Sequence, residues 1–108
     1  MELVEFKAKF KKGNLIVFGE KWMCILCEAS PSFTIGGEPK NVIVYYLLSK
    51  LKEDYFVIPP VARTGIGYIE SYGNKIRLAN NIEKKMFYDR LKTRGYKWNE
   101  DELTYMRI

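Results

Sequence analysis

The chain has 108 residues, of which 47% are hydrophobic and 29% are charged, and its formal net charge is +5. This balance is typical of a globular domain and argues against a disordered or fibrous chain, and a domain of this length buries about 65% of its unfolded surface. The sequence contains no histidine and only two cysteines, which excludes the commonest general base, most zinc and iron sites and a disulfide framework.

The sequence shows no signal for a membrane or for export. Its longest apolar runs, Leu15–Phe18 and Val42–Leu48, fall far short of the roughly 18 to 20 residues that a membrane-spanning helix requires. Residues Met1–Phe6 lack the basic and apolar regions of a signal peptide. We therefore expect a cytoplasmic protein that makes no contact with a membrane.

The first third of the chain predicts strands. Apolar and basic residues alternate in Phe6–Lys11, which predicts a strand with its lysines on the solvent face. Lys12–Asn14 indicates a turn, and Leu15–Phe18 predicts a second strand. A third strand, Trp22–Glu28, is expected to form a hairpin with the second across a turn at Gly19.

Proline and glycine interrupt the middle of the chain. Ala29–Asn41 contains two prolines and two glycines and predicts a loop. Ala62–Asn74 contains three glycines and predicts a second loop, with one short strand near Tyr68–Glu70. The remaining β-rich segments are predicted strands: Val42–Leu48, Tyr55–Ile58 before the two prolines, and Lys75–Leu78.

A helix over residues 80–94 is the best-specified element. Asn80 can cap its N-terminus, and Glu83 three residues later completes a variant of the capping box. Two pairs spaced four residues apart predict an apolar stripe along this helix: Ile82 with Met86, and Phe87 with Leu91.

The end of this helix and the closing hairpin are also marked in the sequence. Gly95 suits the left-handed residue that ends a helix, and Tyr96 can then pack back on Leu91. Residues 96–108 predict a hairpin with a polar turn at 99–102 and with Tyr96 and Trp98 on one face.

The order of strands, one helix and a hairpin predicts an α+β fold, built on an antiparallel sheet or a small β-barrel. We expect a single domain over residues 1–108, with 1–78 mainly β, 80–94 helical and 96–108 a hairpin. No repeat, low-complexity tract or linker divides the chain.

Two short motifs have spacings that also occur in redox, metal-binding or nucleotide-binding sites. Cys24 and Cys27 have the C-x-x-C spacing of redox and metal motifs, but they lie in a predicted strand that sends them to opposite faces. We interpret them as core or partly buried thiols. The segment Gly65–Gly67 has two of the three glycines of a dinucleotide-binding loop and no predicted helix after it, so we interpret it as a turn.

Neighbouring carboxylates occur at Glu53 and Asp54 and in the run Glu100–Glu102. Such groups can serve acid–base or metal chemistry when they are buried and opposed. Adjacent residues in a turn usually point into water, so we expect both groups to be solvated. The sequence predicts no catalytic residue, no metal site and no cofactor.

The last third of the chain is the strongest candidate for a binding surface. Residues 75–108 hold nine lysines and arginines against five acidic residues, whereas residues 1–74 hold nine against eight. The candidate partner-binding residues are Lys84, Lys85, Arg90, Arg94 and Lys97, with Lys92, Tyr88, Tyr96 and Trp98 nearby. Lysine and arginine can neutralise phosphates while aromatic rings stack on bases. Against this, the charges are spread around the helix, and the aromatic residues can serve the core.

Two stretches match a recurring pattern. The first is Phe10–Ile16, and the second comprises Ile76–Ala79, Glu83-Lys84, Leu91-Lys92, Gly95–Asn99 and Leu103. The pattern resembles the opening "F-K-x-G-D-x-I/V" and the tail "RLAT-x-EEK" followed by "LK-x-x-GY-x-WN" of small uncharacterised proteins from gut anaerobes, their phages and mobile elements. The resemblance implies a shared architecture and an origin in a phage or mobile element. It brings no activity and no catalytic residues.

The sequence leaves two functions open. The first is a non-enzymatic binding module that presents aromatic residues and lysines to a protein partner. The second is a nucleic-acid-binding accessory protein that uses the basic helix face. An enzyme is not expected, because catalysis without histidine would have to depend on carboxylates or tyrosines.

Overall fold

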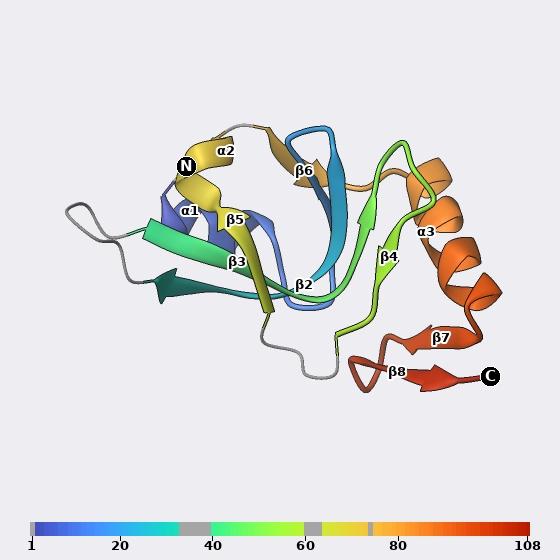
Figure 1. The fold of residues 1–108 in the computed structure, drawn as a ribbon. Coiled ribbons are helices and arrows are strands. Elements are labelled where there is room, and N and C mark those ends of the chain that lie inside the picture. Colours follow the sequence, from blue (N-terminus) through green and yellow to red (C-terminus); the bar gives the residue numbers. More distant parts are fainter. Residues whose placement is uncertain (1, 33–39, 60–63, 74) are drawn as a thin grey trace.

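The computed structural model describes residues 2–32, 40–59, 64–73 and 75–108. These residues form three helices, α1 (Leu3–Lys9), α2 (Ile69–Tyr72) and α3 (Asn81–Thr93). They also form eight strands (Figure 1): β1 (Leu15–Phe18), β2 (Trp22–Ser32), β3 (Lys40–Lys50), β4 (Phe56–Val57), β5 (Thr64–Tyr68), β6 (Ile76–Leu78), β7 (Tyr96–Asn99) and β8 (Thr104–Arg107).

Six of the strands form one antiparallel sheet in the order β4-β3-β2-β1-β6, and β5 pairs with another part of β3. The strands β7 and β8 form a separate hairpin. The predicted α+β class is confirmed. The barrel alternative is wrong, because β6 at one end of the sheet does not pair with β4 or β5 at the other among the described residues.

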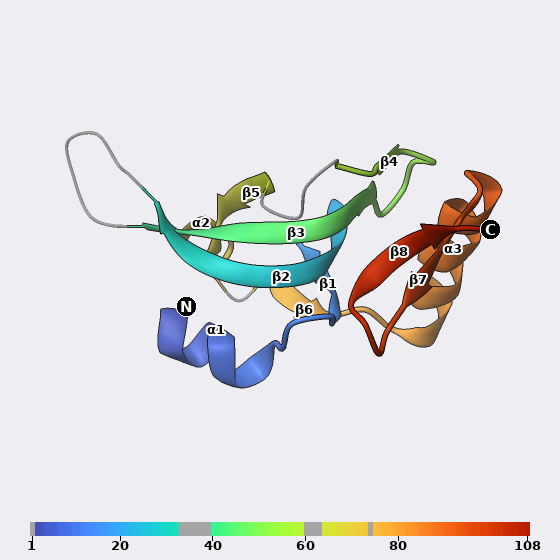
Figure 2. The ribbon, with the colours of Figure 1, turned by 90° about the horizontal axis from the view of Figure 1, so that it is seen from below.

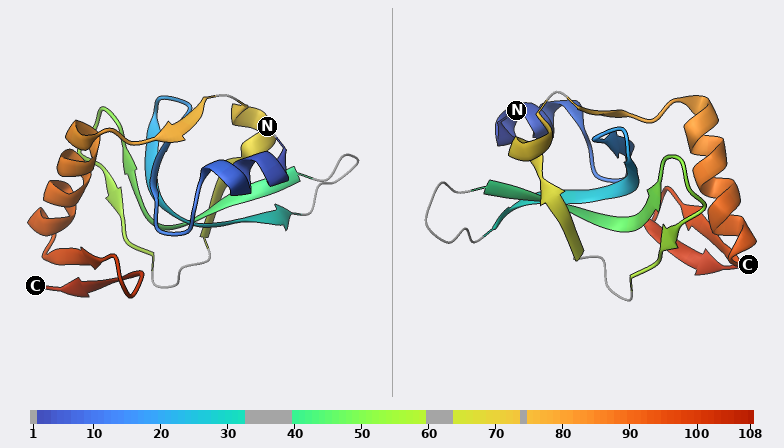
Figure 3. Two further views of the ribbon diagram at one scale, coloured as in Figure 1. Left: turned by 180° about the vertical axis from the view of Figure 1, so that it is seen from behind. Right: turned by 45° about the horizontal axis from the view of Figure 1, so that its top comes forward.

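Both faces of the sheet are covered, and β1 shows this most directly. All four of its residues are buried: Ile16 and Phe18 join one apolar cluster, and Leu15 and Val17 join another. Helices α1 and α2 contribute buried residues to the first cluster. Helix α3 contributes buried residues to the second, and side chains of the β7-β8 hairpin pack against it. Figures 2 and 3 show these two groups of elements toward opposite ends of the sheet.

The predicted strand over Phe6–Lys11 is wrong, because residues 6–9 belong to helix α1 and Phe10 caps its C-terminal end. Phe6 and Phe10 are both buried, with ring centroids 5.0 Å apart, and Leu3 packs against the same cluster. Positions 3, 6 and 10 share one face of a helix. Alternation and helical spacing both place Phe6 and Phe10 together, and the exposure of Ala8 distinguishes the helix from the strand.

The predicted loop Ala29–Asn41 is wrong at both of its ends, and residues 33–39 lie outside the described part. Strand β2 continues to Ser32, and β3 begins at Lys40. Pro31 pairs opposite Asn41 in a part of β2 that β1 does not flank, since β1 pairs only with residues 22–25. Proline is tolerated there because only one neighbouring strand makes hydrogen bonds to it.

The second predicted loop is also corrected, with residues 62, 63 and 74 outside the described part. Thr64–Tyr68 forms β5, and α2 follows it directly. A Cβ atom at Gly65 would lie 2.6 Å from a Val42 methyl group, and Gly67 has φ +74 beside the Tyr72 ring. The two glycines therefore let β5 pack closely on β3 and α2, and they do not form the predicted turn.

The N-terminus of α3 follows the prediction closely. The Asn80 side chain accepts a hydrogen bond from the Glu83 backbone N–H at 2.8 Å, and the Glu83 carboxylate accepts one from the Asn80 backbone N–H at 2.9 Å. Both halves of the capping box are thus present. At the other end, Gly95 has φ +85, and its N–H donates to the Lys92 carbonyl.

The predicted stripe along α3 is half right. Phe87 and Leu91 are fully buried, whereas Ile82 is 81% exposed. Glu83 takes the buried position instead, with 8% of its surface exposed. Because the capping box turns Glu83 inward, its neighbour Ile82 lies about 100° further around the helix and faces water.

The remaining predictions are confirmed with small changes of bounds. Strands at Leu15–Phe18, within Tyr55–Ile58 and within Lys75–Leu78 are present, and residues 96–108 form the hairpin. In that hairpin the Tyr105 hydroxyl donates to the Pro59 carbonyl at 2.6 Å. None of the described helices is long and apolar enough to cross a membrane.

Candidate functional site

Arg90 and Arg94, two of the predicted partner-binding residues, hold α3 against the end of β3 and the turn that follows it. The Arg90 guanidinium donates to the Ser49 hydroxyl at 2.9 Å and to the Lys50 carbonyl. Arg94 donates to the Asp54 carboxylate at 3.1 Å. Their donors are therefore largely occupied within the fold.

The three predicted lysines lie in different surroundings. Lys85 forms an ion pair with Asp89 at 2.7 Å. Lys84 faces a small polar hollow beside the hairpin turn, and Lys97 borders a larger apolar groove. The five predicted residues consequently do not form a single basic patch. They fall into an internal network, a surface ion pair and two separate depressions.

The apolar groove lies between α3 and β7 and has a volume of about 460 Å³. Its walls are mostly apolar and aromatic: Tyr88, Leu91, Tyr96, Trp98 and Ile108. Asp89 of α3 also lines it, and its carboxylate is paired with Lys85. Lys92 of α3 and Lys97 of β7 lie at its borders. Neither lysine takes part in an ion pair within the described residues.

The aromatic walls of the groove are held from behind. The Trp98 ring packs on Tyr46 with centroids 5.4 Å apart, and the Tyr96 ring packs edge-on against Tyr105 at 5.8 Å. The buried Trp98 indole N–H has no hydrogen-bond partner in the part of the chain that the structure describes. Because these rings are fixed by neighbours, the groove is pre-formed.

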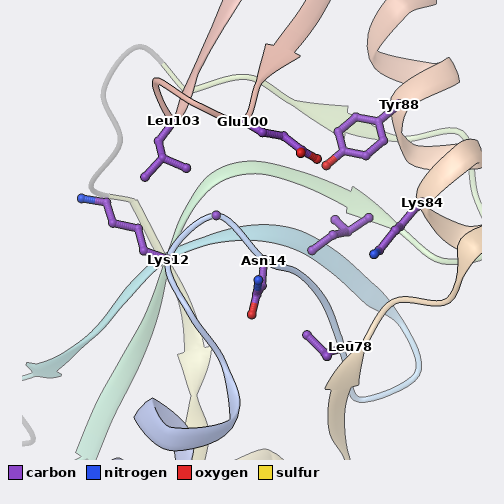
Figure 4. Close-up of a pocket in the computed structure, with 9 residues that line it drawn as sticks. Lys12, Asn14, Leu78, Lys84, Tyr88, Glu100 and Leu103 are labelled. Carbon is purple, nitrogen blue, oxygen red and sulfur yellow. The ribbon is translucent and has the colours of Figure 1, made fainter.

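The polar hollow has a volume of about 260 Å³ and adjoins the groove, since Tyr88 lines both. The turn at residues 12–15, the end of β6, α3 and the hairpin turn all contribute to it. Figure 4 shows the Tyr88 hydroxyl and the Glu100 carboxylate pointing toward one another across its upper side. Burial raises the pKa of Tyr88 to about 12, with a further contribution from the Glu100 charge, so the phenol stays protonated at neutral pH.

Besides the groove and the hollow, a small polar cluster lies where the pairing of β2 with β3 is irregular. The register shifts leave Cys27 of β2 and Tyr46 of β3 without direct partners. The Lys12 ammonium lies 6.0 Å from the centre of the Tyr46 ring. Burial raises the pKa of the Tyr46 phenol, while the nearby Lys12 charge lowers it.

The two cysteines are a core thiol and a partly buried thiol, as predicted. Cys24 is fully buried in an apolar cluster, and burial raises the pKa of its thiol. Cys27 is half-buried. No group of three metal-ligating residues occurs among the described residues, and Glu53, Asp54 and the acidic run at 100–102 are exposed as expected.

We predict that a thiol reagent will label Cys27 well before Cys24 in the folded protein. The nucleophile is the thiolate, and both burial and its raised pKa suppress that form of Cys24. Intact mass measurement during iodoacetamide treatment should show one adduct, followed by a second only after urea is added. The Cys27→Ser variant should remain unlabelled until it unfolds, and rapid native labelling of that variant would contradict the assignment.

The sequence pointed to the lysines but missed most of their surroundings. Asn14 from the first turn is distant from α3 along the chain, and it joins Lys84 and Leu78 only in the folded protein. The Tyr46 ring of β3 packs against the Trp98 ring of β7. No spacing along the chain connects these residues, because the contacts form between separate elements.

Comparisons of this chain with protein-family models, with curated proteins and with solved structures found no match.

Proposed function

We propose that this protein is a non-enzymatic binding module, and that its partner is a protein which places an apolar side chain in the apolar groove. The observation that carries the proposal is the pre-formed groove of about 460 Å³ between α3 and β7. This volume lies within the range of about 300–1,000 Å³ that is typical of ligand pockets. Tyrosine and tryptophan walls are also typical of the centres of protein interfaces.

The charges around the groove indicate the chemistry of the partner. Lys92 and Lys97 border the groove and have no acidic partner within the described residues. The one acidic residue that lines it, Asp89, is paired with Lys85, so the two lysines carry the unpaired charge. Charged groups at the rim of an interface select partners with complementary charge. We therefore infer that acidic residues flank the apolar side chain of the partner.

Nucleic acid is the alternative partner, and the geometry favours it less. Arg90 and Arg94 already bind groups within the fold. The Trp98 ring packs on Tyr46 and the Tyr96 ring on Tyr105, whereas base stacking uses aromatic rings as open platforms. The positive charge at the groove remains available to either partner, so the experiment below includes an oligonucleotide.

The resemblance of the tail to proteins of phages and mobile elements supports a setting for this function. We propose that the module originates in such an element, acts in the cytoplasm and binds a protein of the host. The resemblance contributes no residue roles to this proposal.

Fluorescence anisotropy with a labelled acidic hexapeptide that contains one central leucine tests the groove. A matched peptide with serine in place of leucine should bind about tenfold more weakly or worse, because burying a leucine contributes about 1.5–3 kcal/mol. The double variant Lys92→Glu, Lys97→Glu should lose most of the binding. The control Lys7→Glu, Lys9→Glu changes the net charge equally on the exposed face of α1 and should bind normally.

Two outcomes would overturn the proposal. One is equal affinity for the leucine and serine peptides, and the other is equal weakening by both charge-reversed variants. A labelled single-stranded DNA oligonucleotide serves as the third probe. If it binds more tightly than the peptide and loses affinity steeply as the salt concentration rises, the nucleic-acid alternative is correct instead.

A further inference from the structure

The polar hollow brings opposite charges together without pairing them. Lys84 reaches it from α3, and Glu100 reaches it from the hairpin turn. Neither side chain takes part in an ion pair among the described residues, although Lys85 and Asp89 on the same helix are paired. The Lys84 ammonium and the Glu100 carboxylate thus line the same hollow, and neither charge is neutralised by an ion pair within the described residues.

Tyr88 and Asn14 add further polar groups to the lining of the hollow. Figure 4 shows the Tyr88 hydroxyl beside Glu100, with the Lys84 amine and the Asn14 amide below them. The Tyr88 phenol remains a hydrogen-bond donor at neutral pH, because burial raises its pKa to about 12. The hollow therefore offers an acidic acceptor at Glu100, and donors in the Lys84 ammonium and the Asn14 amide nitrogen, since the Asn14 oxygen accepts from the Lys11 backbone N–H at 2.8 Å. The Lys12 ammonium also lines it.

Leucine side chains form the remaining walls. Leu15 is buried beneath the hollow, Leu103 is half-buried beside it, and Leu78 is 52% exposed. Leu78 is one of the few large apolar side chains that the described residues leave open to water. A ligand with an apolar part would cover it, and removing apolar surface from water is favourable.

We propose that the polar hollow binds a small zwitterion of the size of an amino acid. The ammonium of the ligand faces Glu100, its carboxylate faces Lys84 and the Asn14 amide, and its apolar side chain lies against Leu78 and Leu103. Small-molecule sites are commonly built in this way, from apolar walls with a few placed polar groups.

The volume sets the size of the ligand. The hollow of about 260 Å³ is smaller than the roughly 300 Å³ at which pockets for drug-sized ligands begin. A free amino acid with a branched side chain suits this space better than a peptide or a nucleotide. The site shares Tyr88 with the proposed partner groove, but Lys92, Lys97 and Trp98 line only the groove, so the two sites can be tested by separate substitutions.

Isothermal titration calorimetry of the full chain with three related probes tests the proposal. L-leucine carries both charges, L-leucinamide lacks the carboxylate, and 4-methylpentanoate lacks the amine. We expect saturable binding of L-leucine, and binding of each analogue about tenfold weaker or worse, since each loses one charged contact.

Substitutions then assign each charge to a residue. Lys84→Met should weaken binding of L-leucine while leaving binding of L-leucinamide unchanged, because the amide has no carboxylate for Lys84 to meet. Glu100→Gln should weaken binding of L-leucine while leaving binding of 4-methylpentanoate unchanged. Lys85→Met and Glu102→Gln are matched controls on the same helix and turn, and they should bind L-leucine as the unmodified protein does.

Three results would overturn the inference: no saturable heat with L-leucine, equal binding of the three probes, or equal effects of Lys84→Met and Lys85→Met. Failure of this site would leave the groove proposal intact. The peptide assay uses Lys92 and Lys97, and the amino-acid assay uses Lys84 and Glu100.

Discussion

Replacing Glu83 with alanine is expected to lower the free energy of unfolding by about 2–4 kcal/mol, because this one carboxylate both completes a helix cap and pairs with a charge. Its two oxygens each accept a hydrogen bond from Arg77 at 2.7 Å, and one of them also accepts the Asn80 backbone N–H at 2.9 Å. The carboxylate is mostly buried. Urea denaturation at pH 7, followed by circular dichroism, measures the change.

Glu20 provides the matched control. It pairs with the same Arg77 guanidinium at 2.8 Å, but its side chain is 58% exposed and belongs to no cap. Glu20→Gln should therefore change stability much less than Glu83→Gln does. Similar losses in the two variants would show that the Arg77 pairing alone, and not its combination with the cap, determines the effect.

The same site predicts how stability depends on pH. The Arg77 guanidinium lowers the pKa of the Glu83 carboxylate below its ordinary value of 4.5. A carboxylate with a lowered folded-state pKa adds stability above its unfolded pKa and loses that contribution as the pH falls through the folded value. The stability difference between the unmodified protein and Glu83→Gln should thus be full at pH 7 and much smaller near pH 3. An equal difference at both pH values would contradict the assignment.

Replacing Arg90 with methionine is expected to lower the free energy of unfolding by about 2–3 kcal/mol. Its guanidinium bonds to the Ser49 hydroxyl and the Lys50 carbonyl, and its side chain is only 13% exposed. Methionine can keep much of the packing but leaves the Lys50 carbonyl without this donor. Thermal and urea denaturation measure the loss, and Arg90→Lys should recover only part of it, because an ammonium cannot reproduce the planar fork of arginine.

Arg94 provides the matched control for Arg90, because it is also an arginine and lies about one turn further along the same helix. It contacts Asp54, whose side chain is 70% exposed, so Arg94→Met should lower the free energy of unfolding by less than about 1 kcal/mol.

Because Arg90 stabilises the fold, loss of binding in a charge-reversed Arg90 variant would reflect unfolding as much as a lost contact. Substitutions at Lys84, Lys92 and Lys97 test a binding surface more cleanly, because these side chains form no ion pairs within the described residues.

Local signals in the sequence determined the elements whose ends are marked by specific residues. The capping box at Asn80 and Glu83, the left-handed Gly95 and the hairpin after it were all predicted correctly. These features depend on hydrogen bonds and backbone conformations within a few residues, so their signals are read directly from the chain. The antiparallel α+β class followed from the order of the elements.

Other segments were compatible with more than one structure, and only tertiary packing decided between them. Phe6 and Phe10 fit one face of a strand or of a helix, and burial of both beside Leu3, with Ala8 left exposed, is the pattern of helix α1. Ile82 was predicted to be buried, but the cap at Asn80 and the pairing with Arg77 of β6 both hold Glu83 inward, so Ile82 faces water. Propensity and periodicity are weak where contacts with another element contribute more free energy.

The sequence by itself determined that the chain is a basic α+β domain without histidine, with a well-capped helix and with most of its excess positive charge in the last third. Only the tertiary structure decided which lysines and arginines remain available, because Arg90 and Arg94 meet acceptors at the end of β3 and in the turn after it, about 40 positions away. It also decided where the depressions lie, since residues from the first turn, β6, α3 and the hairpin form the polar hollow together. A cavity is a property of several surfaces packed against one another, and no local pattern along one chain specifies it.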